Sequence, residues 1–500
     1  MSSATIRFPL SPLDHLPPPN YTCSTFYLPL KPGIRPVEAF EVLQEGLHKT
    51  FAQLPWLSGK VWPQSADAPG WRPGQLEIRH DPVDINGPRP YQLRFNQLPS
   101  SLRYEDLRES AFPPDTFEDN DLIWAPFMPD VSNGCEIFVA QANFLPGGCL
   151  VTGAFHHAAG DGNACFMTVN LWADHCKAVQ SQSAAPMAPP PECSDRTLHE
   201  RIWAKEETGK SSDKIDLDVW RLLGLDPFNL QLAESSNGRE PLLSSLTAKA
   251  NGQRMMKSGI FYMSPSNFTA LQDDCIQELG AAAKVSGTHA ICGLVWRCLL
   301  KARFVAAARK TIEPPAQNDD IARLDMILDE RSGFSQSLPQ TYLGNHTVTL
   351  QSSMPLSTLT SPDTSIASVA GVIRANASRI NSIDLLDMYT LVRNLPSFDE
   401  LRRRKRERQL SIAHSAMMIT SMLMIPSGQV NFGDRVFGNG GKPDGARPLM
   451  GAFNRSGTRI CFVLPRTTNG GVEFIVNLYE EEMDLLLDDE EFERYAMFLA

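Results

Sequence analysis

The sequence has no pair of cysteines at the close spacing that zinc sites and dithiol motifs use. Its ten cysteines are spread over 500 residues, and the two nearest to each other are Cys292 and Cys298. A set this dilute excludes a disulfide scaffold. It predicts reduced and mostly buried thiols, the usual state of cysteine in a cytosolic protein.

Long apolar runs are also absent. No window contains the roughly 18 uninterrupted apolar residues that a membrane-spanning helix needs, and the richest stretch, 413–426, is interrupted by Ser415, Thr420 and Ser421. Residues 1–10 lack the apolar core of a signal peptide. The final Met-Phe-Leu-Ala is neither a retention signal nor a peroxisomal one. We therefore expect a cytoplasmic protein that makes no membrane contact.

An excess of basic residues is missing as well. The chain has 46 Lys and Arg against 57 Asp and Glu, a net charge of −11, which argues against a nucleic-acid partner bound through its phosphates. No segment repeats with a period of about 20–50 residues, so solenoids and propellers are excluded. The hydrophobic content of 42% is average for a globular protein, and the length of 500 residues predicts two or three domains.

Helical and strand patterns alternate along the chain. Ser264 before Pro265 predicts one helix start, because serine caps a helix and proline fits its first position. Further helices are expected over 37–54, 195–208, 288–304 and 480–499.

Two strand pairs flank turn sequences. Strands over 137–141 and 149–155 enclose Pro-Gly-Gly, and strands over 459–464 and 472–478 enclose Thr-Asn-Gly-Gly. The stretch 181–195 is rich in Ser, Ala and Pro and predicts a loop. This alternation favours an α/β fold of two similar halves joined by a looser segment. The predicted divisions are an N-terminal half, a crossover segment and a C-terminal half: 1–195, 196–254 and 255–500.

Residues 155–162, Phe-His-His-Ala-Ala-Gly-Asp-Gly, lie between a predicted strand and a predicted helix. Gly160 and Gly162 are expected to allow a sharp turn with positive φ. A histidine at a strand end could serve as general base, because its pKa lies near the operating pH. His156 and His157 should point to opposite faces of the strand, so that one faces a cleft and the other packs.

The same residues leave other interpretations open. A metal site would use His156, His157 and Asp161, but these lack the His-x-x-x-His spacing of a helical zinc pair. The next possible ligands, at 175–176, lie more than three helical turns away. A purely structural histidine is the third interpretation. We favour the general base and expect no metal.

Two motifs and an ordered set of further blocks resemble the BAHD family of plant and fungal acyl-CoA-dependent acyltransferases, specifically its fungal, trichothecene-acetyltransferase-like branch. That family carries HHxxxDG in mid-chain and DFGWG, or a fungal variant, near the C-terminus. The second motif appears here as Asn-Phe-Gly-Asp-Arg-Val-Phe-Gly-Asn-Gly-Gly-Lys-Pro over 431–443. Further blocks follow the family order, so that the resemblance covers nearly the whole chain: 10–14, 54–59, 141–148, 172–173, 295–297, 329–331 and 342–345.

The resemblance implies two pseudo-symmetric αβ domains, each like chloramphenicol acetyltransferase, with a channel between them. Acyl-CoA, expected to be acetyl-CoA, would enter from one side as co-substrate, and a hydroxylated small-molecule acceptor from the other. His157 would take the proton of the acceptor as that group attacks the thioester, without an acyl-enzyme. The resemblance also implies a monomer with no bound cofactor, acting on a secondary metabolite.

Other site residues carry over from the family by position. Asp161 would be structural and would pair with an arginine, for which Arg331 is the first candidate and Arg297 the second. Thr420 is a candidate oxyanion donor, although the family's following tryptophan is replaced here by Met422. Residues expected to shape the site without a chemical role are His156, Gly160, Gly162, Asn345, Asn431, Phe432 and Gly433.

Several features depart from the family or allow a second interpretation. Asn431 replaces the aspartate of the second motif. An alternative alignment places that motif at 437–440, so we assign a catalytic role to neither of the two positions of the motif. The basic run 402–408 is interpreted as a solvated helix face, with contact to CoA phosphates as the alternative. Cys165 is interpreted as a packing residue.

Two other functions stay open. One is a free-standing condensation domain, which shares HHxxxDG but takes acyl groups from a carrier protein. The other is a non-catalytic relative that binds a metabolite, a possibility raised by Asn431 and Met422. An intact His157 and Asp161 favour the enzyme.

Overall fold

The structure of the protein is a computed structural model. It describes residues 5–99, 101–206, 214–225, 255–309, 321–411, 415–425 and 430–500. Much of the predicted crossover segment, 196–254, lies outside these residues. Among the described helices, none has the length and apolar character needed to cross a lipid bilayer.

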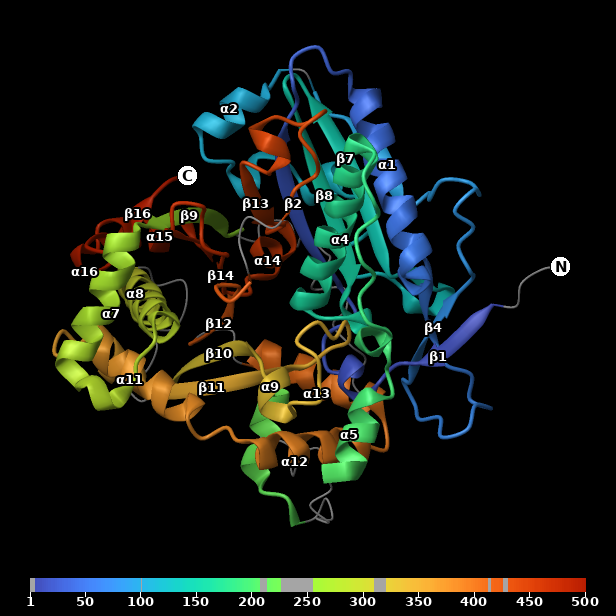
Figure 1. Cartoon of the computed structure of the whole chain (residues 1–500). Coiled ribbons are helices and arrows are strands. Elements are labelled where there is room, and N and C mark those ends of the chain that lie inside the picture. The colour runs from blue at the N-terminus through green and yellow to red at the C-terminus, as the bar shows by residue number, and fades with distance from the viewer. Residues whose placement is uncertain are drawn as a thin grey trace.

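The N-terminal half is built on a five-stranded sheet, in the order β13-β2-β8-β7-β5 (Figure 1). Strands β7 and β8 form the predicted antiparallel hairpin, and Gly147 at its turn has φ of 90°. Helices α1 and α4 pack against each other on this sheet. The bounds are β2 (Tyr21–Pro29), β5 (Leu93–Gln97), β7 (Phe138–Leu145), β8 (Gly148–His156), β13 (Gly445–Pro448), α1 (Pro36–Gln53) and α4 (Gly162–Ser181).

The C-terminal half is built on a seven-stranded sheet, in the order β11-β10-β12-β14-β15-β9-β16. Its core includes the apolar faces of helices α7, α8, α11 and α15. The strands are β9 (Lys257–Met263), β10 (Ile321–Asp329), β11 (Thr347–Pro355), β12 (Ala416–Ser421), β14 (Ile460–Val463), β15 (Val472–Leu478) and β16 (Met497–Phe498). The helices are α7 (Pro265–Leu279), α8 (Gly287–Arg309), α11 (Ile366–Ala377) and α15 (Glu480–Leu487).

Smaller elements surround the two main sheets. A four-stranded sheet has the order β1-β4-β3-β6, with bounds β1 (Ile6–Pro9), β3 (Lys60–Pro63), β4 (Leu76–His80) and β6 (Cys135–Glu136). The remaining helices are α2 (Tyr104–Glu109), α3 (Asp119–Leu122), α5 (Leu198–Glu206), α9 (Arg331–Phe334), α10 (Leu356–Leu359), α12 (Ser382–Arg393), α13 (Phe398–Ser411), α14 (Gly451–Ser456) and α16 (Glu490–Glu493). Two short 3₁₀ turns matter for the site: η1 (Pro12–His15) and η5 (His157–Ala159).

Most predicted elements are present, with ends shifted by a few residues. The Ser264 hydroxyl caps α7 by accepting from Asn267 N at 3.1 Å, with Pro265 at the first helical position. The predicted helix over 480–499 is wrong. Its first part is α15, after which Asp489 starts a separate helix α16 by accepting from the N–H groups of Glu491 and Phe492. The chain then pairs with β9 as strand β16.

The two halves interlock through residues that come late in the chain. Strand β13 pairs antiparallel with β2 and so joins the sheet of the N-terminal half. Phe432 and Phe437 also lie in the N-terminal core, fully buried. The division of the chain at residues 195 and 255 remains a prediction, but its third segment contributes strands and core residues to both halves.

Candidate active site

The two adjacent histidines lie where β8 ends and the turn η5 begins. His156 is fully buried, and its ring packs edge-on against Tyr21 with 5.4 Å between ring centroids. His157 is partly exposed. His156 therefore packs as expected of one histidine of the pair, while a cleft in front of His157 remains a prediction.

The surroundings of His157 keep its imidazole neutral. Burial is the main cause of its lowered pKa, and the charge of Lys405 acts in the same direction. Carbonyl oxygens of the turn and the carboxylate of Asp161 oppose this shift without cancelling it. The Nδ1 atom is buried and has no hydrogen-bond partner among the residues that the structure describes. A neutral ring is the form that a general base requires.

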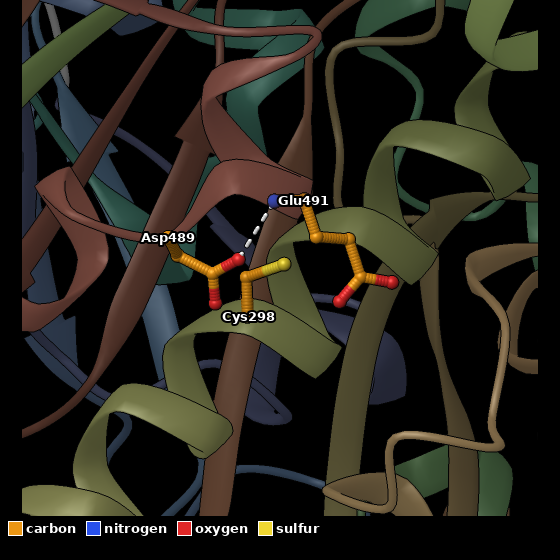
Figure 2. A group of neighbouring side chains, drawn as sticks. All are labelled: Cys298, Asp489 and Glu491. Atoms are coloured by element: carbon orange, nitrogen blue, oxygen red, sulfur yellow. Dashed lines mark hydrogen bonds between the residues drawn. The ribbon is translucent and has the colours of Figure 1, made fainter.

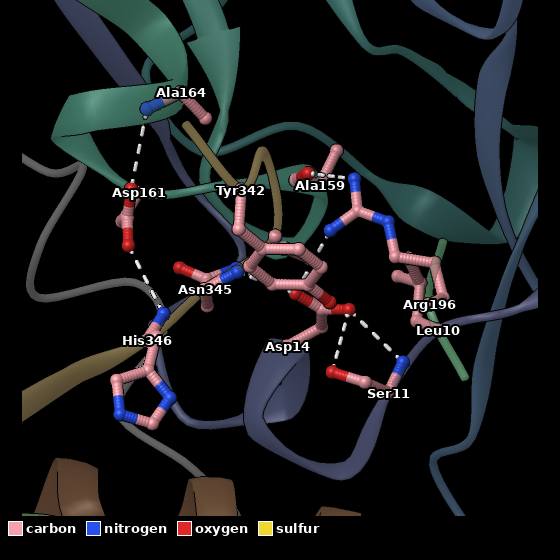
Figure 3. Close-up of polar contacts among 12 residues, drawn as sticks. Leu10, Ser11, Asp14, Ala159, Asp161, Ala164, Arg196, Tyr342, Asn345 and His346 are labelled. Atoms are coloured by element: carbon pink, nitrogen blue, oxygen red, sulfur yellow. Dashed lines mark hydrogen bonds and ion pairs between the residues drawn. The ribbon is translucent and has the colours of Figure 1, made fainter. Parts of the chain in front are cut away.

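Backbone hydrogen bonds hold the turn η5 on several sides (Figure 3). The N–H of His157 donates to the carbonyl oxygen of Asn20 at 2.8 Å. The amide Nδ2 of Asn345 donates to the carbonyl oxygen of His157 at 2.9 Å, and Nη2 of Arg196 donates to the carbonyl oxygen of Ala159 at 2.6 Å. The turn η5 is thus fixed by residues from both halves and from the segment between them.

Asp161 caps helix α4 and forms a buried ion pair. Its Oδ1 accepts from Ala164 N at 3.2 Å, and its Oδ2 accepts from Arg331 Nη2 at 2.8 Å and from His346 N at 3.0 Å. Burial alone would raise the pKa of Asp161, but the charge of Arg331 and the N–H donors outweigh it and lower the pKa. These contacts occupy both carboxylate oxygens.

The arginine predicted first is the partner of Asp161. Arg331 is fully buried, and its Nη2 also donates to the carbonyl oxygens of Tyr342 and Gly344, both at 2.9 Å. Arg297, the second candidate, pairs instead with Glu491, at 2.9 Å from Nε to each carboxylate oxygen. The ion pair between Asp161 and Arg331 is therefore confirmed.

The expectation of positive φ at the two motif glycines is wrong. Gly160 has φ of 170°, which is extended backbone, and Gly162 is the first residue of α4, outside the positive-φ glycines. Gly160 is required for a different reason. A Cβ there would lie 2.6 Å from the carbonyl oxygen of Leu343 and 2.6 Å from Cβ of Ala164. A Cβ on Gly162 would meet nothing within 4 Å.

The loop of the second motif lies at the other end of α4. Gln180, near the C-terminus of that helix, donates to the carbonyl oxygen of Phe432 and accepts from Val436 N at 3.0 Å. Gly433 has φ of 93°, and Asn431 closes the loop by accepting from Gly433 N at 2.9 Å. About 28 Å of helix α4, at 1.5 Å per residue, separates Gln180 from the turn η5. The loop is placed to pack, since the Phe432 ring meets Trp172 with 5.6 Å between centroids.

Thr420 lies on β12, in register with Ile327 of β10 and Phe462 of β14. In the part of the chain that the structure describes, no hydrogen bond connects Thr420 to the turn η5. Its role as oxyanion donor remains a prediction. Cys165 is buried, and burial raises the pKa of its thiol to about 12, which disfavours a thiolate nucleophile.

The basic run 402–408 belongs to helix α13. Arg403 and Arg404 pair with Glu400 of the preceding turn, and Arg402 donates to the carbonyl oxygen of Gly74 and to Asp399. The helix is therefore tied to its own acids and to the N-terminal half. Contact with CoA phosphates stays a prediction.

Cys298, Asp489 and Glu491 form a cluster of possible metal ligands whose ligand atoms lie within 4.8 Å of one another (Figure 2). The acids already have cationic partners. Lys301 Nζ lies 2.9 Å from Asp489, and Arg297 lies 2.9 Å from Glu491. We assign the two acids to these ion pairs and to the cap of α16.

Comparison with known proteins identifies the family. A family model described as "Transferase family" matches residues 115–493, which is more than half of the chain. The chain belongs to the Transferase family. A second model, described as "Trichothecene 3-O-acetyltransferase-like N-terminal domain", matches residues 21–176 of this family member. The resemblance noted from the sequence is confirmed.

Individual relatives of this Transferase family member differ in length. It is 30% identical to the isocyanide synthase-NRPS hybrid crmA of Aspergillus fumigatus, over 98% of the chain but only 31% of that protein. It is 23% identical to eremophilane O-acetyltransferase ORF8 of Penicillium roqueforti, over 98% of both. The structure matches TRI101 of F. sporotrichioides, solved with coenzyme A and T-2, with a TM-score of 0.71, 18% identity and 99% and 100% coverage. This match confirms the predicted fold class.

Proposed function

We propose that the protein is an acyltransferase that moves an acyl group from acyl-CoA to a hydroxyl group of a small secondary metabolite. The observation that carries the proposal is the geometry of His157. Its Nδ1 is buried without a hydrogen-bond partner among the described residues, so we assign proton acceptance to Nε2; its lowered pKa keeps the ring neutral, and Asn345 of the C-terminal half holds its turn. A positioned neutral histidine is the usual general base for proton transfer from a hydroxyl.

In the proposed reaction the acceptor hydroxyl gives its proton to Nε2 of His157 while its oxygen attacks the thioester carbonyl. The tetrahedral intermediate then collapses, the carbon–sulfur bond breaks, and the CoA thiolate takes the proton back from the imidazolium. Thr420 is the candidate donor to the oxyanion, and the Asp161–Arg331 pair maintains the fold around the turn. The raised pKa of Cys165 supports direct transfer rather than a thiol acyl-enzyme.

The relatives support acetyl as the group transferred. The P. roqueforti relative is named an O-acetyltransferase, and the F. sporotrichioides structure holds coenzyme A. We propose a fungal-type secondary metabolite as acceptor on the same ground. We further propose that the protein acts as a monomer in the cytoplasm. The donor and the acceptor would reach the site through opposite mouths of the channel.

A carrier-dependent condensation reaction is the second candidate. One observation favours it: the relative with 30% identity is an NRPS hybrid, of which this chain spans about a third. In that case the acyl group would arrive as a thioester on a carrier protein, and free acyl-CoA would support no turnover.

The test is thiol release measured with DTNB from acetyl-CoA and a pool of hydroxylated fungal metabolites. Wild type, His157→Ala and the control His80→Ala are compared, because His80 is partly exposed and lies outside the site. Acceptor-dependent release in wild type and control, lost in His157→Ala, supports the proposal. Turnover only with an acyl-loaded carrier protein supports the second candidate, and silence with every donor supports a non-catalytic binder.

A further inference from the structure

Asp14 is a fully buried carboxylate of the N-terminal turn η1, and within the described part of the chain it accepts hydrogen bonds from three residues (Figure 3). Its Oδ2 accepts from both N and Oγ of Ser11 at 2.9 Å. Its Oδ1 accepts from Asn345 N at 2.9 Å, Asn345 Nδ2 at 3.0 Å and Arg196 Nη1 at 3.3 Å. Such a cage suits a group that only accepts, which is what a carboxylate is.

Two of these donors continue to the catalytic turn. The amide of Asn345 has two N–H bonds, and it directs one to Asp14 and the other to the carbonyl oxygen of His157. Arg196 divides its guanidinium in the same way, with Nη1 to Asp14 and Nη2 to the carbonyl oxygen of Ala159. One carboxylate therefore orients both groups that hold η5 by its carbonyls.

The amide of Asn345 shows that Asp14 decides its orientation. Its Oδ1 is buried without a hydrogen-bond partner, which is an unfavourable state for an acceptor. Turning the amide over would bring that oxygen against the carboxylate of Asp14 and the carbonyl of His157, two groups that can only accept. Leaving Oδ1 without a partner costs less free energy than placing it against two acceptors, and this is the orientation that the structure shows.

We propose that Asp14 is a positioning residue for the catalytic histidine. It acts through Asn345 and Arg196, which fix the backbone of η5 and thereby the direction of the His157 ring. The inference rests on the proposed function, since it assigns a role within that same site. The carboxylate of Asp14, in the N-terminal turn, thus forms hydrogen bonds with the segment between the halves and with the C-terminal half.

The test is the isosteric variant Asp14→Asn. Its amide nitrogen must face one set of donors, either those of Ser11 or those of Asn345 and Arg196. The hydrogen bonds from that set are then lost. We expect kcat to fall about 10²-fold, the cost of roughly 1 Å of misplacement, with little change in KM for acetyl-CoA. Combined with His157→Ala, the substitution should cause no further loss, because residues that act as a unit are not additive.

A second measurement does not depend on activity. In protein labelled with ¹⁵N-histidine, the imidazole signals of His157, assigned by their loss in His157→Ala, should shift in Asp14→Asn together with their titration curve. Ser11→Ala is the milder variant, since it removes one donor and leaves the charges intact. It should move the same signals less far and still fold.

The control is Glu482→Gln, which breaks another buried pair, with Arg459 at 2.7 Å, in the C-terminal half. It should leave kcat and the His157 signals unchanged. The positioning role is overturned if wild type is active and the folded Asp14→Asn variant has a normal kcat and unshifted His157 signals. If wild type transfers no acyl group from any donor, the proposed function fails, and the histidine signals alone then decide whether Asp14 orients the ring.

Discussion

Replacing Asp161 by Asn removes one charge of a buried ion pair and leaves the other in place. Arg331 is 0% exposed and Asp161 1% exposed, so water cannot solvate the remaining guanidinium, which keeps only the half-exposed Asp329, 2.8 Å from Nη1, as a counter-charge. The new amide nitrogen must also face a donor, because both oxygens of Asp161 accept from N–H groups. Asp161→Asn should therefore cost far more than the loss of a surface ion pair.

The expected cost is about 3 kcal/mol in the free energy of unfolding, the lower end of the range of about 3–5 kcal/mol for a buried pair that loses one partner, because Asp329 still pairs with Arg331. A typical domain has only about 5–15 kcal/mol in total. Because folding lowers the pKa of Asp161, its contribution is complete above the ordinary carboxyl pKa of about 3.9 and is lost as pH falls through the folded value. The difference between wild type and variant should shrink accordingly in acid.

Urea unfolding followed by tryptophan fluorescence measures this cost. Trp172 and Trp296 are fully buried, one in the core of each half, so the signal reports on both. The matched control is Arg35→Met, which breaks an exposed pair with Glu38 and should leave the unfolding curve close to that of wild type. A loss of 1 kcal/mol or less for Asp161→Asn would refute the reasoning. A normal unfolding curve with a large drop in kcat would instead place Asp161 in the chemistry.

Three further predictions concern the site and the loop of the second motif. The rate kcat/KM should be constant near neutral pH and fall only in acid, as the ring of His157 becomes charged below its ordinary pKa of about 6.5; an acidic limb centred above pH 7 would contradict the lowered pKa. Gly160→Ala should yield little folded, active enzyme because its Cβ meets the backbone of Leu343, whereas Gly162→Ala, at the first position of α4, should fold with a stability close to that of wild type; expression and thermal melting compare them. Phe432→Ala should cost about 3–5 kcal/mol of stability while kcat per folded molecule stays normal, and a selective loss of kcat would give the loop a catalytic role.

Local patterns in the sequence were sufficient for the elements around the site. The hairpin of β7 and β8, the helices α1 and α7 and the two faces of the histidine pair follow from periodicity, caps and turn residues. These are interactions between residues a few positions apart. The helix expected over 480–499 failed for an equally local reason, since the cap formed by Asp489 was overlooked.

Long-range contacts are the part that the sequence did not reveal. Asp14 lies in a segment that was noticed only as a family-like block, and its main partner Asn345 is 331 positions away. Arg196 lies just after a proline-rich loop and carries no motif. Gly160 was assigned to the wrong constraint, because its need for a small residue comes from Leu343 on a distant segment rather than from its own φ. Which donors surround a carboxylate is decided by the tertiary fold.

The late arrival of strand β13 has a consequence for synthesis on the ribosome. Strand β2 is paired with β8 as soon as residue 156 is made, but its other edge stays open until β13 begins at residue 445, about 290 residues later. At roughly 5–20 residues per second this interval lasts about 15–60 seconds. An open strand edge is a template for pairing with another chain. We therefore expect the nascent protein to be most prone to aggregation during this interval, until β13 covers the open edge of β2.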